Sequence, residues 1–321
     1  MASSLPDNPS LPRLRDEARA LQRDPDPALI REHHPRPEAA LGGDRLALHH
    51  AQLTVARKYG FSGWPALVQY LEAAAALSVD PSRFDETKAA AADRFCALAT
   101  LRYDESDAPA RRETAERLLQ TEPGLTQDHV WAAATAADVP ALTGLLRAGA
   151  GLASAPGGPY GWPPLMYLAY ARVPQADPLT AATLLLDAGA DPNAGYLWRG
   201  MSTPFTVLTG VFGEGEQGPR RQPRHRLATP LAELLLRRGA HPVDQQALYN
   251  RMFRPDDTHL NQLFAHGLAE AGPSPWERRL GEAMETRAQM WRRQLAWAAE
   301  HGFTGRLALL SRHGIDTAAV G

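Results

Sequence analysis

The stretch that decides the fold is Leu184-Leu185-Leu186-Asp187-Ala188-Gly189-Ala190-Asp191-Pro192-Asn193. Its three leucines predict the apolar face at the end of a helix, and Gly189 can adopt the positive φ that ends a helix without a Cβ clash. Asp191, Pro192 and Asn193 favour a turn through their backbone chemistry. We therefore predict a helix, a glycine stop and a turn, in which Asp191 and Asn193 serve the turn and not a reaction.

The same pattern recurs along the chain, with stop glycines at 149, 189, 239, 267 and 314. The copies lie in residues 145–150, 235–242, 263–267 and 309–316. A helix stop that recurs in this way is typical of repeat proteins, whose units bury an apolar face only by stacking on their neighbours. The sequence therefore predicts an all-α fold built from stacked helix pairs.

Composition narrows the classes of function. The chain has 321 residues and a net charge of −2, so it lacks the basic surface of a protein that grips nucleic acid without regard to sequence. No apolar run approaches the ~20 residues that cross a bilayer, and residues 1–12 lack the features of a secretory signal. We expect a cytoplasmic protein with no nucleic-acid or membrane partner, and we expect the single cysteine, Cys96, to be buried.

Residues 1–80 form a helical module in this interpretation, with one helix ending at Gly60 and a second running from about 64 to 77. Residues 50–67 resemble the helical region that precedes the repeats in bacterial ankyrin-repeat proteins. The matching run is Ala56-Arg57-Lys58-Tyr59-Gly60-Phe61-Ser62-Gly63-Trp64-Pro65. His49 and His50 point about 100° apart on a helix, so we expect no metal there.

Residues 85–321 resemble an ankyrin-repeat domain. The family's repeats open with Thr-Pro-Leu-His-x-Ala-Ala, and related openings occur at 128–134, 162–169, 202–208, near 248 and at 294–302. In the first of these, Asp128 replaces threonine and keeps an oxygen acceptor for the helix start. The resemblance implies an ankyrin-repeat solenoid of five to six irregular helix-pair repeats, whose first helices and loops line a concave groove.

The repeat lengths are irregular. The stop glycines are separated by 40, 50, 28 and 47 residues, whereas an ankyrin repeat has about 33. We therefore predict inserted loops at about 153–161, 194–201 and 211–227, and one inserted amphipathic helix at about 275–293. The glycine-rich first loop lacks the lysine and Ser/Thr of a phosphate-binding loop, so we expect no nucleotide cofactor.

Aromatic and basic residues in these loops are candidate binding anchors. Tyr160 and Trp162 belong to the first loop, and Tyr196, Trp198 and Arg199 to the second. Exposed aromatic and arginine side chains are typical of binding sites, but Trp198 could instead pack on a neighbouring loop. The third loop carries four arginines and His225, and it either grips an acidic ligand or is simply solvated.

Alignment of the repeats places several polar and aromatic residues toward the groove. Tyr167 and Tyr170 are three residues apart, so they can share a helix face. We expect His225 to act as a base and a tyrosine as an acid in a reaction that needs neither metal nor cofactor. The other residues expected to face the groove and bind the substrate are Trp131, Thr206, Asn250 and Arg251, with Trp297 beside them.

The sequence also looks similar to ankyrin-type proteins of actinobacterial polyketide pathways, among which a dehydratase/cyclase role is known. That resemblance implies a lyase that binds a small oxygenated, polyketide-like molecule and catalyses acid–base dehydration or Michael-type addition. It rests on the N-terminal helical module, the irregular repeats and the aromatic loops, and not on a catalytic motif. Since most ankyrin proteins bind other proteins, a non-catalytic partner-binding module is the alternative.

Overall fold

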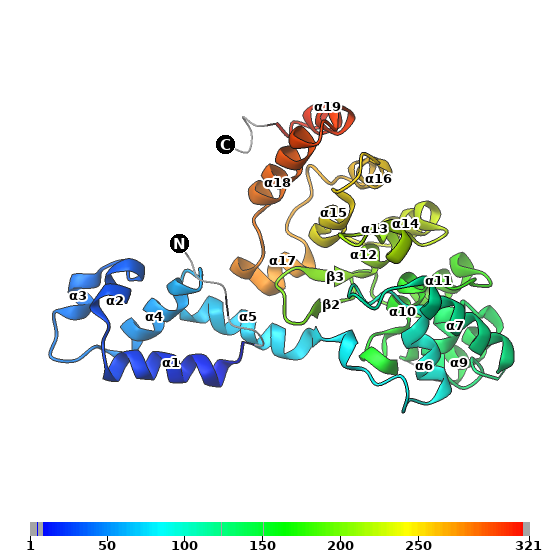
Figure 1. Cartoon of the computed structure of the whole chain (residues 1–321), viewed down its shortest axis with the longest axis horizontal. Coiled ribbons are helices and arrows are strands. Elements are labelled where there is room, and N and C mark those ends of the chain that lie inside the picture. Colours follow the sequence, from blue (N-terminus) through cyan, green and yellow to red (C-terminus); the bar gives the residue numbers. More distant parts are fainter. Residues whose placement is uncertain (1–4, 6–8, 123, 150, 317–321) are drawn as a thin grey trace. The chain divides into compact units, whose positions relative to one another are not determined.

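The computed structural model describes Leu5 and residues 9–122, 124–149 and 151–316, and these residues are mostly helical (Figure 1). The all-α class is therefore confirmed. Among the described residues, no helix is both long and apolar enough to cross a membrane. Contacts divide the chain into two compact units. The first comprises Met1–Ser78, Arg199–Thr203 and Pro275–Thr286, and the second comprises Val79–Trp198, Pro204–Ser274 and Arg287–Gly321.

The first unit contains five helices from the start of the chain and one short helix from a later segment. They are α1 (Leu11–Arg23), α2 (Pro27–His33), α3 (Pro37–Leu41), α4 (Leu48–Lys58), α5 (Trp64–Leu77) and α17 (Pro275–Leu280). Asp26 caps α2 by accepting from the amides of Ala28 and Leu29. Gly60 follows α4 with a φ of 87°, which confirms the predicted stop.

Two segments from the second half of the chain complete the first unit. The Glu282 carboxylate accepts hydrogen bonds of 2.6 Å from both the amide and the hydroxyl of Ser62. Gln69 donates to the carbonyl oxygens of Arg278 and Arg279, and the Tyr70 hydroxyl donates to that of Gly200. The end of the second inserted loop, which was expected to bind a ligand, and the first part of the inserted helix are therefore used to build this unit.

The predicted helix at 275–293 is wrong as a single element. The chain forms α17, a 3₁₀ turn (Gly281–Ala283) and then α18 (Arg287–Glu300), which belongs to the second unit. Gly281 has a φ of 55° at the break. Helical spacing of apolar residues continues across this break, so the pattern alone did not reveal it.

The second unit holds the remaining helices. They are α6 (Ala91–Ala99), α7 (Pro109–Thr121), α8 (Val130–Ala136), α9 (Val139–Ala148), α10 (Pro164–Tyr170), α11 (Pro178–Asp187), α12 (Val207–Phe212), α13 (Gly218–Arg221), α14 (Ala228–Arg237), α15 (Gln245–Arg251), α16 (Thr258–Ala265), α18 and α19 (Thr304–Arg312). A short strand, β1 (Ser78–Val79), spans the boundary in sequence between the units. Strands β2 (Gly195–Trp198) and β3 (Pro204–Thr206) form an antiparallel hairpin that pairs Tyr196 with Phe205.

The helices of the second unit pack in two rows. In one row α6, α8, α10, α12 and α15 contact one another in succession, and in the other α9, α11, α14 and α16 do the same. One apolar core runs between the rows, and Cys96 lies fully buried in it, as predicted. The helix starts are set by acidic caps, since Asp138, Asp177 and Asp244 each accept from an amide of the first turn. The predicted cap at Asp128 is wrong, because the His129 ring caps α8 instead.

The predicted glycine stops are confirmed at four positions. Gly189, Gly239, Gly267 and Gly314 all have positive φ, between 71° and 96°. After Gly189, the amide of Ala190 donates to the Leu185 carbonyl at 2.9 Å, and the other three stops repeat this bond. Gly149 differs, with a φ of −132°.

The turns that follow successive stops are joined by hydrogen bonds. Asn193 donates from its side-chain amide to the Gly239 carbonyl at 2.9 Å and accepts from the His241 amide at 2.8 Å. Asp191 accepts from the Asn193 amide within the same turn. The prediction that Asp191 and Asn193 are turn residues is therefore confirmed.

Candidate functional site

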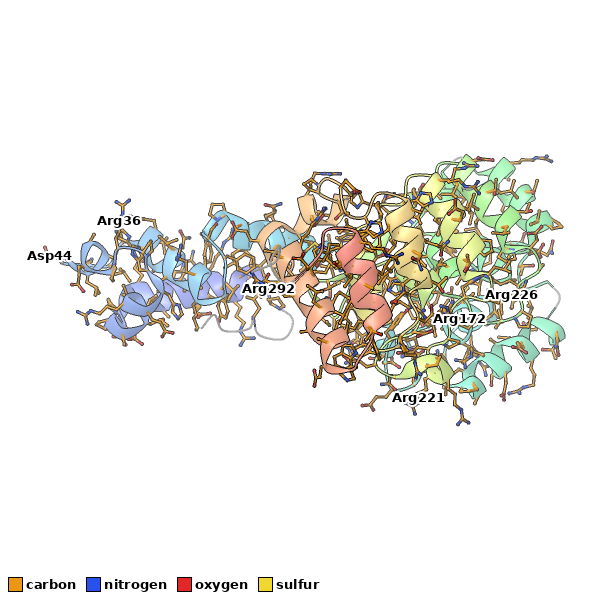
Figure 2. The ribbon with its side chains drawn as sticks, turned by 90° about the horizontal axis from the view of Figure 1, so that it is seen from above. Arg36, Asp44, Arg172, Arg221, Arg226 and Arg292 are labelled. Atoms are coloured by element: carbon orange, nitrogen blue, oxygen red, sulfur yellow. The ribbon has the colours of Figure 1, made fainter. Side chains whose placement is uncertain are left out.

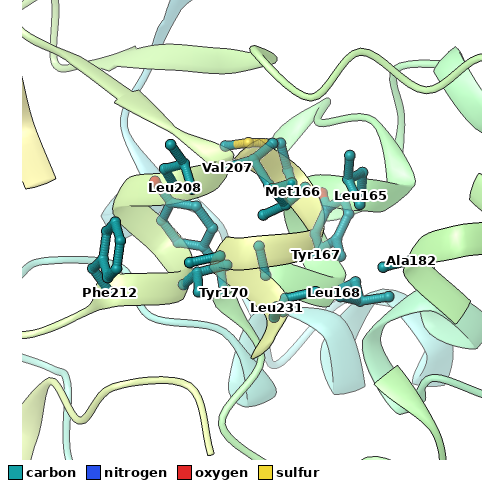
Figure 3. Close-up of a cluster of buried hydrophobic side chains, with 14 of the residues drawn as sticks. Leu165, Met166, Tyr167, Leu168, Tyr170, Ala182, Val207, Leu208, Phe212 and Leu231 are labelled. Carbon is teal, nitrogen blue, oxygen red and sulfur yellow. The ribbon is translucent and has the colours of Figure 1, made fainter. Parts of the chain in front are cut away.

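Five of the predicted site residues form a buried aromatic cluster. Tyr160, Trp162, Tyr167, Tyr170 and Tyr196 are each 5% exposed or less. The Trp162 ring lies 4.6–5.4 Å, centroid to centroid, from the rings of the other four. Figure 3 shows Tyr167 and Tyr170 among the apolar side chains of α10, α12 and α14. The expectation that Tyr167 and Tyr170 face an open groove is wrong, because the face of α10 that they share is core. Tyr160, Trp162 and Tyr196 were expected as exposed loop anchors and are instead buried in the same cluster.

The hydroxyl groups of both tyrosines on α10 are used by the fold. Tyr167 accepts from the Tyr160 amide at 2.9 Å and donates to the Gly157 carbonyl at 2.8 Å, which holds the first inserted loop in place. Tyr170 donates to the Thr206 carbonyl at 2.9 Å. Burial raises the pKa of both tyrosines far above the usual value. Neither hydroxyl is placed to protonate a substrate.

His225 is fixed within the fold. Its ring is 3% exposed, Nδ1 accepts from the Leu227 amide at 3.1 Å and Nε2 lies 2.5 Å from the Gln175 side-chain oxygen. This pattern requires the proton on Nε2, which donates to Gln175. Burial, aided by Arg172 and Arg226, lowers the pKa of His225 to about 3. The imidazole is therefore a weak base whose one basic nitrogen is already occupied.

The third insertion is an ordered loop that contains α13. Arg172 donates to the carbonyl oxygens of Gly210 and Pro223 and so holds both ends of the loop. Inside the loop, Arg224 pairs with Glu214 and Asp256 at 3.1 and 2.9 Å. Arg221, labelled in Figure 2, is exposed and donates to the Glu105 carbonyl oxygen and to the Gln217 side chain.

Arg251, Thr206 and Asn250 are also interior residues. Arg251 is 1% exposed and forms ion pairs with Glu214 and Asp256, so its predicted place on the groove is wrong. Thr206 caps α12 and donates from its hydroxyl to Asp244. Asn250 is 3% exposed and accepts from Gln246 at 2.8 Å.

The remaining predicted residues are at least partly exposed. Trp131 donates from its indole nitrogen to the Ala155 carbonyl at 3.1 Å and packs tightly on Gly157, where a Cβ would come within 2.1 Å of the ring. Trp198 is half-buried and donates to the Arg102 carbonyl at 2.9 Å. Arg199, at the hairpin tip, is exposed and has a φ of 49°.

Another group of partly accessible rings in the second unit lies elsewhere. We call it the aromatic strip, and it consists of Tyr249, Phe253, Trp297, His301 and Phe303. His301 is exposed and the other four are half-buried. Trp297, which was expected to face the groove, is half-buried within this strip.

The strip is built from the ends of two helices, α15 and α18, and the residues that follow each of them. Tyr249 lies on α15 and Phe253 in the turn that follows it, whereas Trp297 lies on α18 and His301 directly after its last residue. Phe253 meets Tyr249 and Trp297 edge to face at 5.2 and 5.1 Å between ring centroids. His301 stacks on Trp297 at 3.9 Å.

Charged groups border the strip on the Tyr249 side. The guanidinium of Arg293 lies 4.9 Å from the centroid of the Tyr249 ring, a cation–π distance. The Tyr249 hydroxyl donates to the Glu216 carboxylate. Burial and that hydrogen bond raise the pKa of Tyr249 to about 12, so the phenol stays neutral.

The arrangement is suited to binding more than to acid–base chemistry. Half-exposed rings beside arginine are the residues that carry most of the energy in protein interfaces.

No family model, curated protein or solved structure matches the chain. Within the described ranges, no group of three or more His, Cys, Asp or Glu side chains could hold a metal ion. The sequence signal for the strip was the four-residue spacing of Tyr249 and Phe253, which the repeat alignment overlooked.

Proposed function

We propose that the second unit is an ankyrin-type repeat array that binds a protein partner through the aromatic strip. The repeat assignment is supported by the two rows of stacked helices and by the four equivalent glycine stops. The bonds from Asn193 to Gly239 and His241 support it further, because they join equivalent turns of neighbouring helix pairs.

The observation that carries the binding function is the strip itself. The Phe253 ring contacts the rings of both Tyr249 and Trp297, and all three residues are only half-buried. A soluble protein gains stability by burying such rings, so a group that stays accessible is typical of an interaction site. A partner that covers these three rings would remove their remaining apolar surface from water, and this burial would favour binding.

Cofactor-free dehydration or cyclisation has less support from the geometry. That reaction requires an acid and a base that reach a substrate. The hydroxyls of Tyr167 and Tyr170 donate to backbone carbonyls, and His225 donates to Gln175. A ligand would have to displace these bonds before any of the three residues could act.

Site-specific photo-crosslinking tests the binding function. A benzophenone amino acid at Phe253 should trap a partner from a lysate of the native host, and the same group at Leu48 should not. Leu48 is the matched control because it is an exposed, large apolar residue of the first unit. Adding Trp297→Ala to the Phe253 probe should abolish the adduct. Equal adducts at both positions, or an adduct that survives Trp297→Ala, would refute the proposal.

A further inference from the structure

Two exposed arginines belong to segments that adjoin the aromatic strip. Arg254 directly follows Phe253, and its Nη2 lies 3.1 Å from the point where a Cβ on Gly218 would sit. Arg254 therefore reaches over the first residue of α13, the helix that carries Arg220. Both arginines are exposed, and within the described part of the chain neither forms an ion pair.

The carboxylates of the same region are mostly paired with other groups. Glu214 and Asp256 are bound by Arg224 and Arg251. Asp257 pairs with the buried guanidinium of Arg306 at 2.6 Å. Two further carboxylates lie near the strip, since Glu216 accepts from Tyr249 and Glu300 ends α18 beside His301. On the side of the strip next to α13, Glu216 thus faces the guanidinium groups of Arg220 and Arg254, which are unpaired within the described residues, so cations exceed anions there.

We infer that the partner presents an acidic peptide segment with an apolar anchor. This inference rests on the proposed function. The anchor would cover Phe253 and Trp297, and Asp or Glu side chains of the segment would pair with Arg254 and Arg220. Guanidinium groups bind carboxylates with two parallel hydrogen bonds, which also fixes the direction of the peptide.

Single-stranded nucleic acid is the other class of polymer that binds aromatic rings together with arginine. The geometry favours a peptide. Base stacking needs free ring faces, whereas one face of Trp297 is covered by the His301 ring at 14° and 3.9 Å. The rings of Tyr249 and Trp297 stand nearly perpendicular to that of Phe253, so the three rings do not form the set of parallel platforms on which successive bases stack.

Fluorescence anisotropy with three labelled probes tests the inference. The probes are a 12-residue peptide of Asp, Glu, Leu and Phe, the same peptide with Lys in place of its acids, and a 12-nucleotide oligouridine. The full chain should bind the acidic peptide at low ionic strength, and binding should weaken as salt screens the charges. The lysine peptide and the oligouridine should bind at least about fivefold more weakly.

Two charge reversals provide the matched comparison. Arg254→Glu should weaken binding of the acidic peptide by at least about fivefold, and Arg147→Glu should leave it unchanged. Arg147 is an exposed arginine on α9, so its reversal alters the net charge equally. Circular dichroism melts confirm that both variants fold.

The outcomes separate this inference from the proposed function. Equal binding of the acidic and lysine peptides, equal effects of the two reversals, or tighter binding of oligouridine would overturn the acidic-peptide inference. If the acidic-peptide inference failed but crosslinking at Phe253 still depended on Trp297, the proposed binding function would remain supported. If crosslinking did not depend on Trp297, the proposed function would itself fail.

Discussion

The hydroxyl of Tyr170 donates a 2.9 Å hydrogen bond to the carbonyl oxygen of Thr206. The bond connects the end of α10 to the last residue of β3, from which α12 begins. Tyr196 lies in the same cluster, with its ring 6.3 Å from that of Tyr170, but its buried hydroxyl has no hydrogen-bond partner in the described structure. Two tyrosines in one environment thus differ in what their hydroxyls contribute.

This difference gives a matched pair of substitutions. Tyr170→Phe should lower the free energy of unfolding by about 1–2 kcal/mol, because the buried Thr206 carbonyl loses its donor. Tyr196→Phe should be neutral or slightly stabilising, because it removes a buried polar group that has no partner. Urea denaturation of the three proteins measures both effects. A larger loss for Tyr196→Phe than for Tyr170→Phe would contradict this assignment.

The glycine stops give a second matched pair. Gly189→Ala should cost about 1–2 kcal/mol, because an L-residue resists the φ of 92° found there. Gly144 lies inside α9, where an added Cβ would meet nothing within 4 Å, so Gly144→Ala should be neutral or stabilise by up to about 1 kcal/mol. Thermal melts followed by circular dichroism distinguish the two. Similar shifts of Tm for both variants would argue that the effect of Gly189→Ala does not come from its positive φ.

The stops were predictable because their chemistry is local. A glycine after a leucine-rich helix and before a turn defines a helix end whatever packs around it, as Gly189 and Gly239 show. The burial of Tyr167 was not predictable in this way. Its three-residue spacing from Tyr170 places both on one helix face, but only the neighbouring helices decide whether that face is open.

Long-range contacts explain the other differences. Glu282 lies 220 residues from Ser62 in sequence, and nothing local indicates that the two meet. His225 looked like a loop histidine because its surroundings have no apolar periodicity, yet Gln175, 50 residues away, fixes its ring. Trp297 was expected to face the groove, whereas Phe253 was overlooked because it lies beyond α15, whose residues near 248 were the ones aligned.

Acid should destabilise the protein through His225. Its pKa is lowered from 6.5 to about 3 in the folded state, so between these pH values the unfolded chain binds more protons. The stabilisation is complete above pH 6.5 and is lost as pH falls, at up to about 1.4 kcal/mol per pH unit.

His225→Gln isolates this contribution, since glutamine has no titrating group but can still donate to Gln175. Burial also lowers the pKa of His34, His50 and His259, and these remain in both proteins, so they cancel in the comparison. The free energy of unfolding should therefore fall less steeply in the variant from pH 6.5 to pH 4. Parallel curves would show that His225 is not buried in its neutral form.

The joined turns give a local prediction. Asn193→Ala removes both the donor to the Gly239 carbonyl and the acceptor of the His241 amide, so hydrogen exchange at His241 should speed up. Asn193→Asp keeps a side-chain oxygen and should preserve protection of that amide while losing the bond to Gly239. Because each bond joins the turns of neighbouring helix pairs, the faster exchange should centre on 239–242 and leave the buried helix α10 unchanged. Hydrogen exchange followed residue by residue with NMR measures this effect. Uniformly faster exchange across the second unit would mean that the two hydrogen bonds of Asn193 do not stabilise the turns locally.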